Sequence, residues 1–282
     1  MMAPRTEPPP NGRPPEGMRM RIWLQKHTIE GRVPALDRCY RRLVDIADGL
    51  GAELDIHTLP AEVYRDELPA GYVRFGAVEE RFSWYFGQQA VAAQEQGYDV
   101  FLLTISQDPG LTLARRLTRI PCVGYGETSL RLAQMYTSHV GVVGFIPELQ
   151  VPILENFTRY GLGTTQVSFE YLDVRPEVIA GAFEGDTDPF LEEFSAAARR
   201  CLARGCEVII PGEGLPNELL VRSGIQSIDG AAVIDSDAAA VHMAVLLGRL
   251  AASGALIRPT RGYWNALPPE GLDRHLRDVL QQ

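Results

Sequence analysis

Short apolar runs alternate along the chain with longer amphipathic segments, a pattern typical of βαβ units around a mostly parallel sheet. The short runs are rich in β-branched residues and predict strands at 20–24, 53–58, 99–104, 122–125, 139–145, 166–171, 207–210 and 231–234. Helical spacing predicts helices at 33–49, 82–96, 126–136, 147–160, 188–204, 215–222 and 237–252. The chain is therefore expected to be an α/β protein.

The second half of this pattern repeats the first. The run Asp99-Val-Phe-Leu-Leu-Thr matches Glu207-Val-Ile-Ile-Pro-Gly, and each is followed by a loop, a helix, another apolar strand and a helix of small residues. The repeat predicts two pseudo-symmetric Rossmann-like halves with mostly parallel sheets and an active-site cleft between them. We assign 1–17 to a Pro-rich disordered tail, 18–137 to a first half completed by part of the C-terminal region, 138–255 to a second half and 256–282 to a C-terminal extension.

Composition narrows the classes of partner. A formal net charge of -9 and a pI of about 5.1 argue against a nucleic-acid partner or an anionic membrane surface. The apolar runs are too short to cross a bilayer, and residues 1–17 lack the apolar core of a secretory signal, so we expect a cytoplasmic protein with reduced thiols. Four cysteines without CxxC spacing, five scattered histidines and the absence of a dinucleotide or phosphate-loop fingerprint predict no metal and no cofactor.

Ligands of open α/β sheets bind beyond the carboxyl ends of the strands. The loops 25–28, 105–110, 145–147 and 212–217 occupy such positions in the predicted halves. We expect these four loops to line the cleft.

The same loops carry a family likeness. Ser106-Gln-Asp-Pro-Gly-Leu, Pro121-Cys-Val-Gly-Tyr-Gly-Glu, Val142-Val-Gly-Phe-Ile-Pro-Glu and Val233-Ile-Asp-Ser-Asp-Ala-Ala-Ala-Val occur in the order in which hydantoin racemases carry similar segments. The chain thus resembles the aspartate/glutamate and hydantoin racemase superfamily over about residues 20–252. In that family two cysteines on opposite sides of the substrate Cα exchange its proton.

At the two matching positions this sequence has Ile105 and Glu213. An alkane side chain carries no proton, so two-base racemisation is disfavoured and Glu213 becomes the expected single catalytic acid or base. An apolar wall at Ile105 would desolvate the carboxylate and raise its pKa toward neutrality. Gly212 and Gly214 permit close approach of substrate, and the helix after them offers N-terminal amides to an oxyanion. The alternative is a solvated carboxylate at a helix start.

Further contacts with substrate are expected from the first half. Lys26, His27 and Thr28 stand where hydantoin racemases have an Asn-Pro-Asn-Thr turn, and a cation beside an imidazole suits a substrate carboxylate or a leaving group. The alternative is that Lys26 and His27 are exposed loop residues. Ser106 is placed to hydrogen-bond substrate, whereas Asp108 is expected to cap the helix that follows it.

Helix starts also attract carboxylates without any function. Glu127 and Thr128 open a helix at a place that resembles the family's substrate contacts, although the helix dipole alone explains an acid there. His242, in an alanine-rich helix, is expected to pack rather than react. The aromatic segment 82–86 is expected to lie in the core or in a dimer interface, and the aromatics of 258–265 are expected to pack across the cleft or against a neighbouring subunit.

These features favour a cofactor-independent enzyme acting on a small hydantoin-like ring, including a thio-substituted ring, or on a related carboxylated compound. Hydrolysis at the ring with Glu213 as the base is the preferred reaction. An isomerase, racemase or decarboxylase with one-sided Cα proton transfer is the alternative, and an inactive small-molecule binding protein is a third. The resemblance also implies a homodimer or a higher homo-oligomer.

Overall fold

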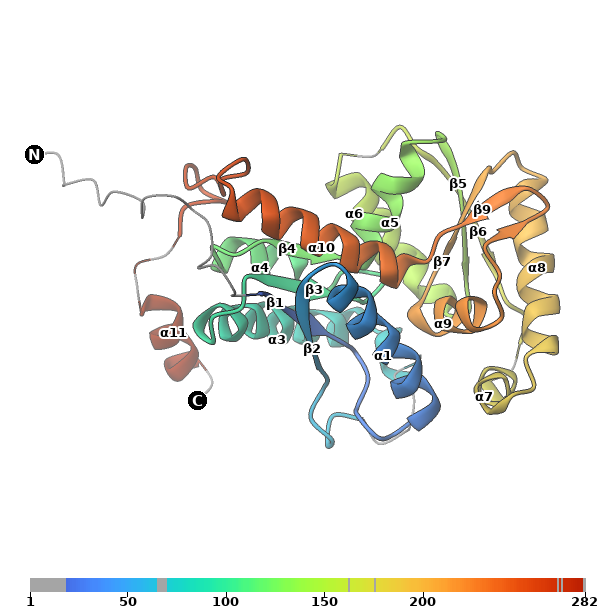
Figure 1. Ribbon diagram of the computed structural model, residues 1–282, viewed down its shortest axis with the longest axis horizontal. Coiled ribbons are helices and arrows are strands. Elements are labelled where there is room, and N and C mark those ends of the chain that lie inside the picture. Colours follow the sequence, from blue (N-terminus) through green and yellow to red (C-terminus); the bar gives the residue numbers. More distant parts are fainter. Residues whose placement is uncertain are drawn as a thin grey trace, which may run out of the picture.

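The computed structural model describes residues 19–64, 70–161, 163–174, 176–267, 269 and 271–280, so the predicted tail 1–17 lies outside the described residues. Two sheets organise the described chain (Figure 1). The first has the order β2-β1-β3-β4 and the second β6-β5-β7-β9-β8. The first sheet comprises β1 (Met20–Gln25), β2 (Ala52–His57), β3 (Val100–Leu103) and β4 (Cys122–Gly124). The second comprises β5 (His139–Gly144), β6 (Gln166–Tyr171), β7 (Val208–Pro211), β8 (Ser227–Ile228) and β9 (Ala231–Val233).

The two sheets share one strand order apart from β8. In both sheets the first strand along the chain pairs with the second on one side and the third on the other, and the third also pairs with β4 in the first sheet and with β9 in the second. All these pairs are parallel; only β8 runs antiparallel, against β9. The prediction of two pseudo-symmetric α/β halves with mostly parallel sheets is confirmed. The residue boundaries assigned to the halves stay a prediction.

Helices cover the faces of both sheets. In α1 (Pro34–Gly49) the residues Leu36, Tyr40, Leu43 and Ala47 are buried, which is the spacing that places one apolar stripe against a sheet. Proline at the first turn fits there because its missing N–H would have no helical partner. The other helices are α2 (Ala70–Val73), α3 (Gly76–Glu95), α4 (Leu111–Leu117), α5 (Tyr125–Gln134), α6 (Gln150–Arg159), α7 (Pro176–Glu184), α8 (Asp188–Leu202), α9 (Gly214–Arg222), α10 (Ser236–Ala252) and α11 (Leu272–Leu280).

Two helices cross from one sheet to the other. Helix α5 follows β4 of the first sheet but also packs on β5 and β7 of the second, whereas α10 follows β9 and packs on β1, β3 and β4 of the first. Figure 1 shows α10 lying across the first sheet. One apolar core joins the two sheets through these crossing helices and includes Val100 of β3, Val143 of β5 and Ala240 of α10. The crossing fixes the two halves against each other at the carboxyl ends of their strands.

The predicted elements are largely present. Each of the eight predicted strands is found, and β8, only two residues long, is an additional strand. The helix predicted at 82–96 begins earlier, at Gly76, and the helix predicted at 147–160 starts as a 3₁₀ turn, Pro147–Leu149, before α6. Helices α2, α7 and α11 are also additional. Among the described helices, no segment is both long and apolar enough to cross a membrane.

Candidate functional site

A cleft of about 580 Å³, open to solvent, lies at the carboxyl ends of the central strands. Its walls come from the loops that follow β1, β3, β5 and β7, together with Tyr40 of α1, Val73 of α2 and Leu149. Seven of the predicted site residues line it: Lys26, His27, Thr28, Ile105, Ser106, Glu213 and Gly214. The other three, Glu127, Thr128 and Gly212, do not.

Glu213 is the buried carboxylate of this cleft. It precedes α9 in extended conformation, is only 8% exposed, and its oxygens accept hydrogen bonds from the backbone N–H of Phe145 (3.1 and 3.2 Å) and Ile146 (3.1 Å). Burial raises the pKa of Glu213 to about 8, and the two amides oppose this rise without cancelling it. The side chain is therefore not the solvated carboxylate of the alternative prediction. It holds a pKa suited to taking and returning a proton near neutral pH.

Glycine at the end of β5 makes room for this carboxylate. A Cβ on Gly144 would lie 2.9 Å from Oε1 and 3.1 Å from Oε2 of Glu213. Gly212 packs just as closely, since a Cβ there would lie 3.0 Å from the Cα of Gly144. Gly212 thus shapes the turn from behind and does not face the cleft. Gly214 does face it, with only Tyr40 and Asp237 within 4 Å of an added Cβ.

The wall of the cleft built by the first sheet carries the alkane side chain of Ile105 at the position where the wall built by the second sheet carries the acid Glu213. Ile105 is 6% exposed and lines the cleft two residues after β3, and Glu213 stands two residues after β7. The four cysteines, all buried, lie elsewhere and none of them lines the cleft. The cleft therefore presents a carboxylate, but no thiol, for proton transfer.

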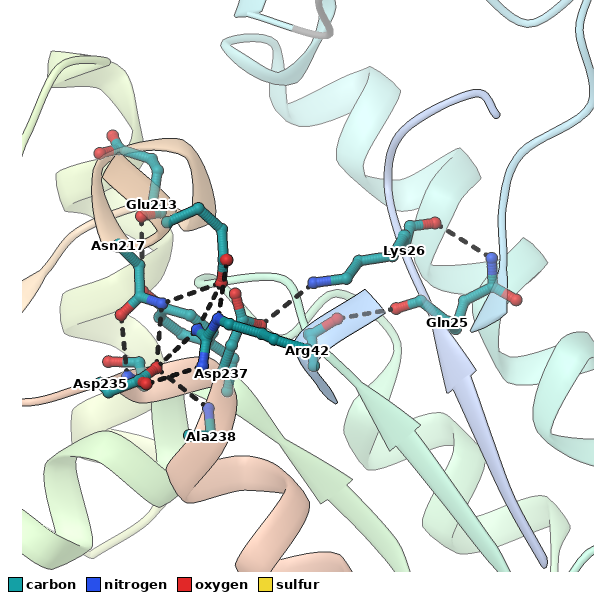
Figure 2. A network of polar contacts seen from close by, with 12 residues as sticks. Gln25, Lys26, Arg42, Glu213, Asn217, Asp235, Asp237 and Ala238 are labelled. Atoms are coloured by element: carbon teal, nitrogen blue, oxygen red, sulfur yellow. Dashed lines mark hydrogen bonds and ion pairs between the residues drawn. The ribbon is translucent and has the colours of Figure 1, made fainter. Parts of the chain in front are cut away.

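Lys26 and His27 are buried, so the alternative of exposed loop residues is wrong. Lys26 is 1% exposed, and its Nζ lies 3.1 Å from Oδ1 of Asp237 and 3.4 Å from the centre of the Tyr40 ring. Figure 2 shows Lys26 reaching toward Asp237, while the Glu213 carboxylate points away from this ion pair. The charge of Lys26 is already balanced by Asp237. A free cation for a substrate carboxylate, as the sequence suggested, is not present at Lys26.

His27 is neutral rather than a second cation. Burial lowers its pKa to about 3, and its ring contacts Phe82 and Phe86 of α3 and lies 2.5 Å, through Nδ1, from the Tyr64 hydroxyl. The aromatic segment 82–86 thus packs against His27 without lining the cleft itself. Thr28 contributes a buried hydroxyl, Oγ1, which has no hydrogen-bond partner among the described residues.

The loop after β3 divides its polar residues between cleft and scaffold. Ser106 lines the cleft and donates its hydroxyl to the side chain of Gln107, which lines it too. Asp108 does not cap the helix that follows it. Its carboxylate accepts from the backbone N–H of Gly126 (3.0 Å) and Glu127 (2.7 Å), and therefore caps α5 instead. The carboxylate also accepts a hydrogen bond from Tyr160, and burial raises the pKa of Asp108 to about 7.

Glu127 lies outside the cleft as a member of an ion-pair cluster. Its carboxylate lies 2.6 Å from Arg115 and 2.7 Å from Arg131, and these arginines lower its pKa against the effect of burial. Thr128 is buried beside it on α5. Glu127 does lie at a helix start, as predicted, but its carboxylate binds two arginines and does not face the substrate cleft. The aromatic pair Tyr263 and Trp264 is likewise absent from the cleft lining, is exposed, and Trp264 stacks on Arg116.

The sequence analysis missed Val73, Thr104 and Leu149 of the cleft lining, and three polar residues of the site. Tyr40 lines the cleft from α1, and Asp237 pairs with Lys26 from the first turn of α10. Tyr125, at the start of α5, donates its hydroxyl to the carbonyl of Pro211 (2.9 Å) and so fixes the turn that carries Glu213. No local motif marks these residues, because each acts across the contact between the two halves. Asp237 appeared only as the start of a small-residue helix.

The described residues contain no group of three or more His, Cys, Asp or Glu side chains that would hold a metal ion. A second polar network lies behind the cleft: Arg42 binds Glu218 (2.6 and 2.9 Å) and Asp235 (2.8 and 2.9 Å), and Asn217 accepts from the N–H of Ser236 (2.9 Å). Figure 2 shows this network beside the Lys26–Asp237 pair. It ties α1, α9 and the start of α10 together.

Known proteins resemble this chain in sequence and in fold. A hydantoin racemase of Rhizobium meliloti is 28% identical over 164 residues, which are 55% of this chain and 63% of that protein. The segments matched in the curated relatives span less than two thirds of their length. An allantoin racemase from Klebsiella pneumoniae superposes with a TM-score of 0.65 at 22% identity, covering 89% of this chain and 94% of that one. An allantoin racemase from Pseudomonas fluorescens gives 0.62 at 18% identity, with 89% and 97% covered.

These comparisons reverse the order of the reactions expected from the sequence. Ring hydrolysis finds no support among them, and the isomerase alternative fits better. The family model described as Asp/Glu/Hydantoin racemase matches residues 39–244, which include the loops after β3, β5 and β7. The chain belongs to the Asp/Glu/hydantoin racemase family.

Proposed function

We propose that the protein uses the proton-transfer chemistry of its family on one face of its substrate: it removes and returns the proton on a carbon next to a carbonyl in a small, uncharged, hydantoin-like ring. Glu213 is the acid and base, and it acts on one face of that carbon. The observation that carries the proposal is a carboxylate with a pKa of about 8 in the cleft, facing no second proton carrier at the equivalent position, Ile105.

An uncharged ring suits the electrostatics of the cleft. Its single lysine is matched by Asp237, its histidine is neutral, and no arginine is among its lining residues. A free amino acid would have to bring its carboxylate out of water into a cleft with no unpaired cation among its lining residues, which is costly. A cyclic ureide needs only hydrogen-bond donors and acceptors. The hydroxyls of Thr28 and Ser106 and the side chain of Gln107 supply them.

The α-proton of such a ring is acidic enough for a carboxylate of raised pKa. The C–H electron pair enters the ring as an enolate forms, Glu213 takes the proton, its carboxyl exchanges that proton with solvent, and it then delivers a proton to the same carbon. With one carrier the proton comes and goes on one face. The reaction therefore exchanges the α-proton with solvent while the configuration is kept.

The test is proton exchange in D₂O with each enantiomer of 5-methylhydantoin and of allantoin, followed by mass spectrometry, NMR and optical rotation against a buffer blank. We expect enzyme-dependent uptake of one deuteron without loss of optical activity, and a fall of about 10²–10⁴-fold in Glu213→Gln. The matched control is Glu127→Gln, which changes a buried carboxylate outside the cleft and should exchange as the parent does.

Each other outcome contradicts the proposal. A ring-opened product would show that the protein is a hydrolase. Exchange with inversion of configuration would require a second proton carrier on the wall that holds Ile105. Binding without exchange makes the protein a small-molecule binder. Equal exchange rates in the parent and Glu213→Gln remove Glu213 as the base.

A further inference from the structure

Lys26 is the only lysine in a chain with 27 Lys and Arg residues, and it lies where a lysine costs most. Its side chain is 1% exposed, whereas the arginines that form ion pairs in this protein are 23% or more exposed. Burying an ammonium is unfavourable unless its hydrogens and charge are satisfied. A buried lysine on the lining of a reactive cleft is thus better explained by chemistry than by stability.

Lys26 lines the cleft, and its contacts leave part of its hydrogen-bonding capacity unused. An ammonium has three N–H donors. One reaches Oδ1 of Asp237 at 3.1 Å, and the charge also lies over the face of Tyr40. No other hydrogen bond joins Nζ to a described residue. A neighbouring hydroxyl on the same wall, Oγ1 of Thr28, is buried and has no partner among the described residues either.

Asp237 is held as a partner for Lys26 by the crossing of α10. It is fully buried in the first turn of α10, and its second oxygen, Oδ2, has no hydrogen-bond partner among the described residues. The charged groups that bear on the pair are Glu218 and Arg42, and burial lowers the pKa of Lys26 while Asp237 raises it. Asp237 therefore both aims the ammonium and opposes the lowering of the Lys26 pKa by burial.

We propose that Lys26 is a catalytic residue that hydrogen-bonds the ring oxygen on which negative charge develops, and that Asp237 is its positioning residue. This inference rests on the proposed function and adds an electrophile to it. When Glu213 takes the α-proton, the C–H pair forms the C=C bond of the enolate and the carbonyl π pair moves onto oxygen. The Lys26 proton stays on nitrogen and is shared with that oxygen through the hydrogen bond. On the way back each pair returns, so no oxidant, reductant or leaving group is needed.

The single lysine makes a direct test possible. Protein grown with ¹⁵N-lysine gives one Nζ signal in the folded wild-type enzyme. The probe is barbiturate, a planar cyclic ureide that is an enolate anion at neutral pH, and uncharged 5-methylhydantoin is its control. We expect saturation with barbiturate to shift the Nζ resonance of a protonated amine clearly, and more than 5-methylhydantoin does. An Nζ signal that ignores bound barbiturate would overturn the proposal.

Variants separate catalysis from structural support. Lys26→Gln alone leaves Asp237 buried and unpaired, so the double variant Lys26→Gln with Asp237→Asn, which removes both charges, is the main test. We expect it to bind barbiturate about 10–100-fold more weakly and 5-methylhydantoin less than threefold more weakly, as for loss of a charged hydrogen bond. In Asp237→Asn the Nζ signal should move to that of a neutral amine at a lower pH than in the parent. Equal weakening of both ligands, or an unchanged Nζ titration, contradicts these roles.

The two proposals fail separately. If the parent exchanges the α-proton through Glu213 while the double variant exchanges as fast, Lys26 is not the electrophile and the proposed function stands. If the parent exchanges nothing, the proposed function fails, and the barbiturate titration still reports whether Lys26 binds an enolate oxygen.

Discussion

The two sheets share a strand order, but equivalent positions in them carry opposite chemistry. Two residues beyond β3 stands Ile105, and two residues beyond β7 stands Glu213. Directly beyond β1 is Lys26, whereas directly beyond β5 is Phe145, which offers only its backbone N–H to the Glu213 carboxylate. The duplicated fold builds a symmetric cleft. Its side chains then make that cleft asymmetric, with a base on one wall and a cation on the other.

The same contrast holds for the last residues of the first strands. β1 ends in Gln25, whose side chain is fully buried, and β5 ends in Gly144, where any side chain would collide with Glu213. The segments that follow β3 and β7 keep one shared task. Asp108 binds the first amides of α5, and Asn217 binds the first amide of α10, so each anchors the helix that crosses to the other sheet. Scaffold roles are thus duplicated, whereas the proposed catalytic roles are not.

Of the changes predicted from this asymmetry, we expect the largest in the pH dependence of the proton-exchange rate. Glu213 must be ionised to take a proton, and its pKa is about 8. We therefore expect kcat/KM for exchange to rise about tenfold per pH unit from pH 5 and to level off near pH 8, about 10³-fold in all. Exchange kinetics between pH 5 and 9 measure it. A profile that levels off near pH 5 would show an ordinary carboxylate and break the contrast with the first wall.

Stability should respond to pH at the same residue. The folded protein holds the Glu213 proton up to about pH 8, while the unfolded chain releases it near 4.5, so folded molecules bind more protons between these values. The stability contributed by this group is full below pH 4.5 and is lost as pH rises through 8. Relative to Glu213→Gln, the free energy of unfolding of the parent should therefore fall by about 2–4 kcal/mol over that window. Denaturant titrations of both proteins at pH 4.5, 6.5 and 8.5 measure the difference, and a constant difference would contradict the burial of an ionisable carboxyl.

Glycine at the end of β5 should matter more than glycine elsewhere. Gly144→Ala places a methyl group 2.9 Å from Oε1 and 3.1 Å from Oε2 of Glu213, so the carboxylate must shift relative to the amides of Phe145 and Ile146. We expect exchange to fall about 10–100-fold, within the range that displacement of a catalytic group causes. Gly181→Ala in α7, where an added Cβ meets nothing within 4 Å, is the matched control. Comparable rates in the two variants would mean that the observed place of the carboxylate is not the working one.

The sequence could predict those parts of the site whose contacts are local or repeated along the chain, but not the contacts between residues far apart in the sequence. Strand periodicity located the four loops, and alignment of the two halves singled out Ile105 and Glu213, because these signals are local or repeat within the chain. The Lys26–Asp237 pair joins residues 211 positions apart and exists only because α10 crosses onto the first sheet. No periodicity reports such a crossing. The burial of Lys26 and the neutrality of His27 depend on it or on α3, so a free cation was predicted where the fold supplies a matched pair.

Glu127 is the reverse case: the sequence analysis placed it in the site, and the structure places it outside the cleft. Its carboxylate is 10% exposed and bound by Arg115 and Arg131, whose side chains are 39% and 45% exposed. Glu127→Gln should cost about 1–2 kcal/mol of unfolding free energy, because two partly exposed arginines lose their partner but can turn to water. The exchange rate should change less than twofold, since the carboxylate lies behind the wall and not on it. A large loss of exchange with little loss of stability would place Glu127 in the active site. A buried carboxylate paired with arginines at a helix start would then have to be counted as catalytic in this fold.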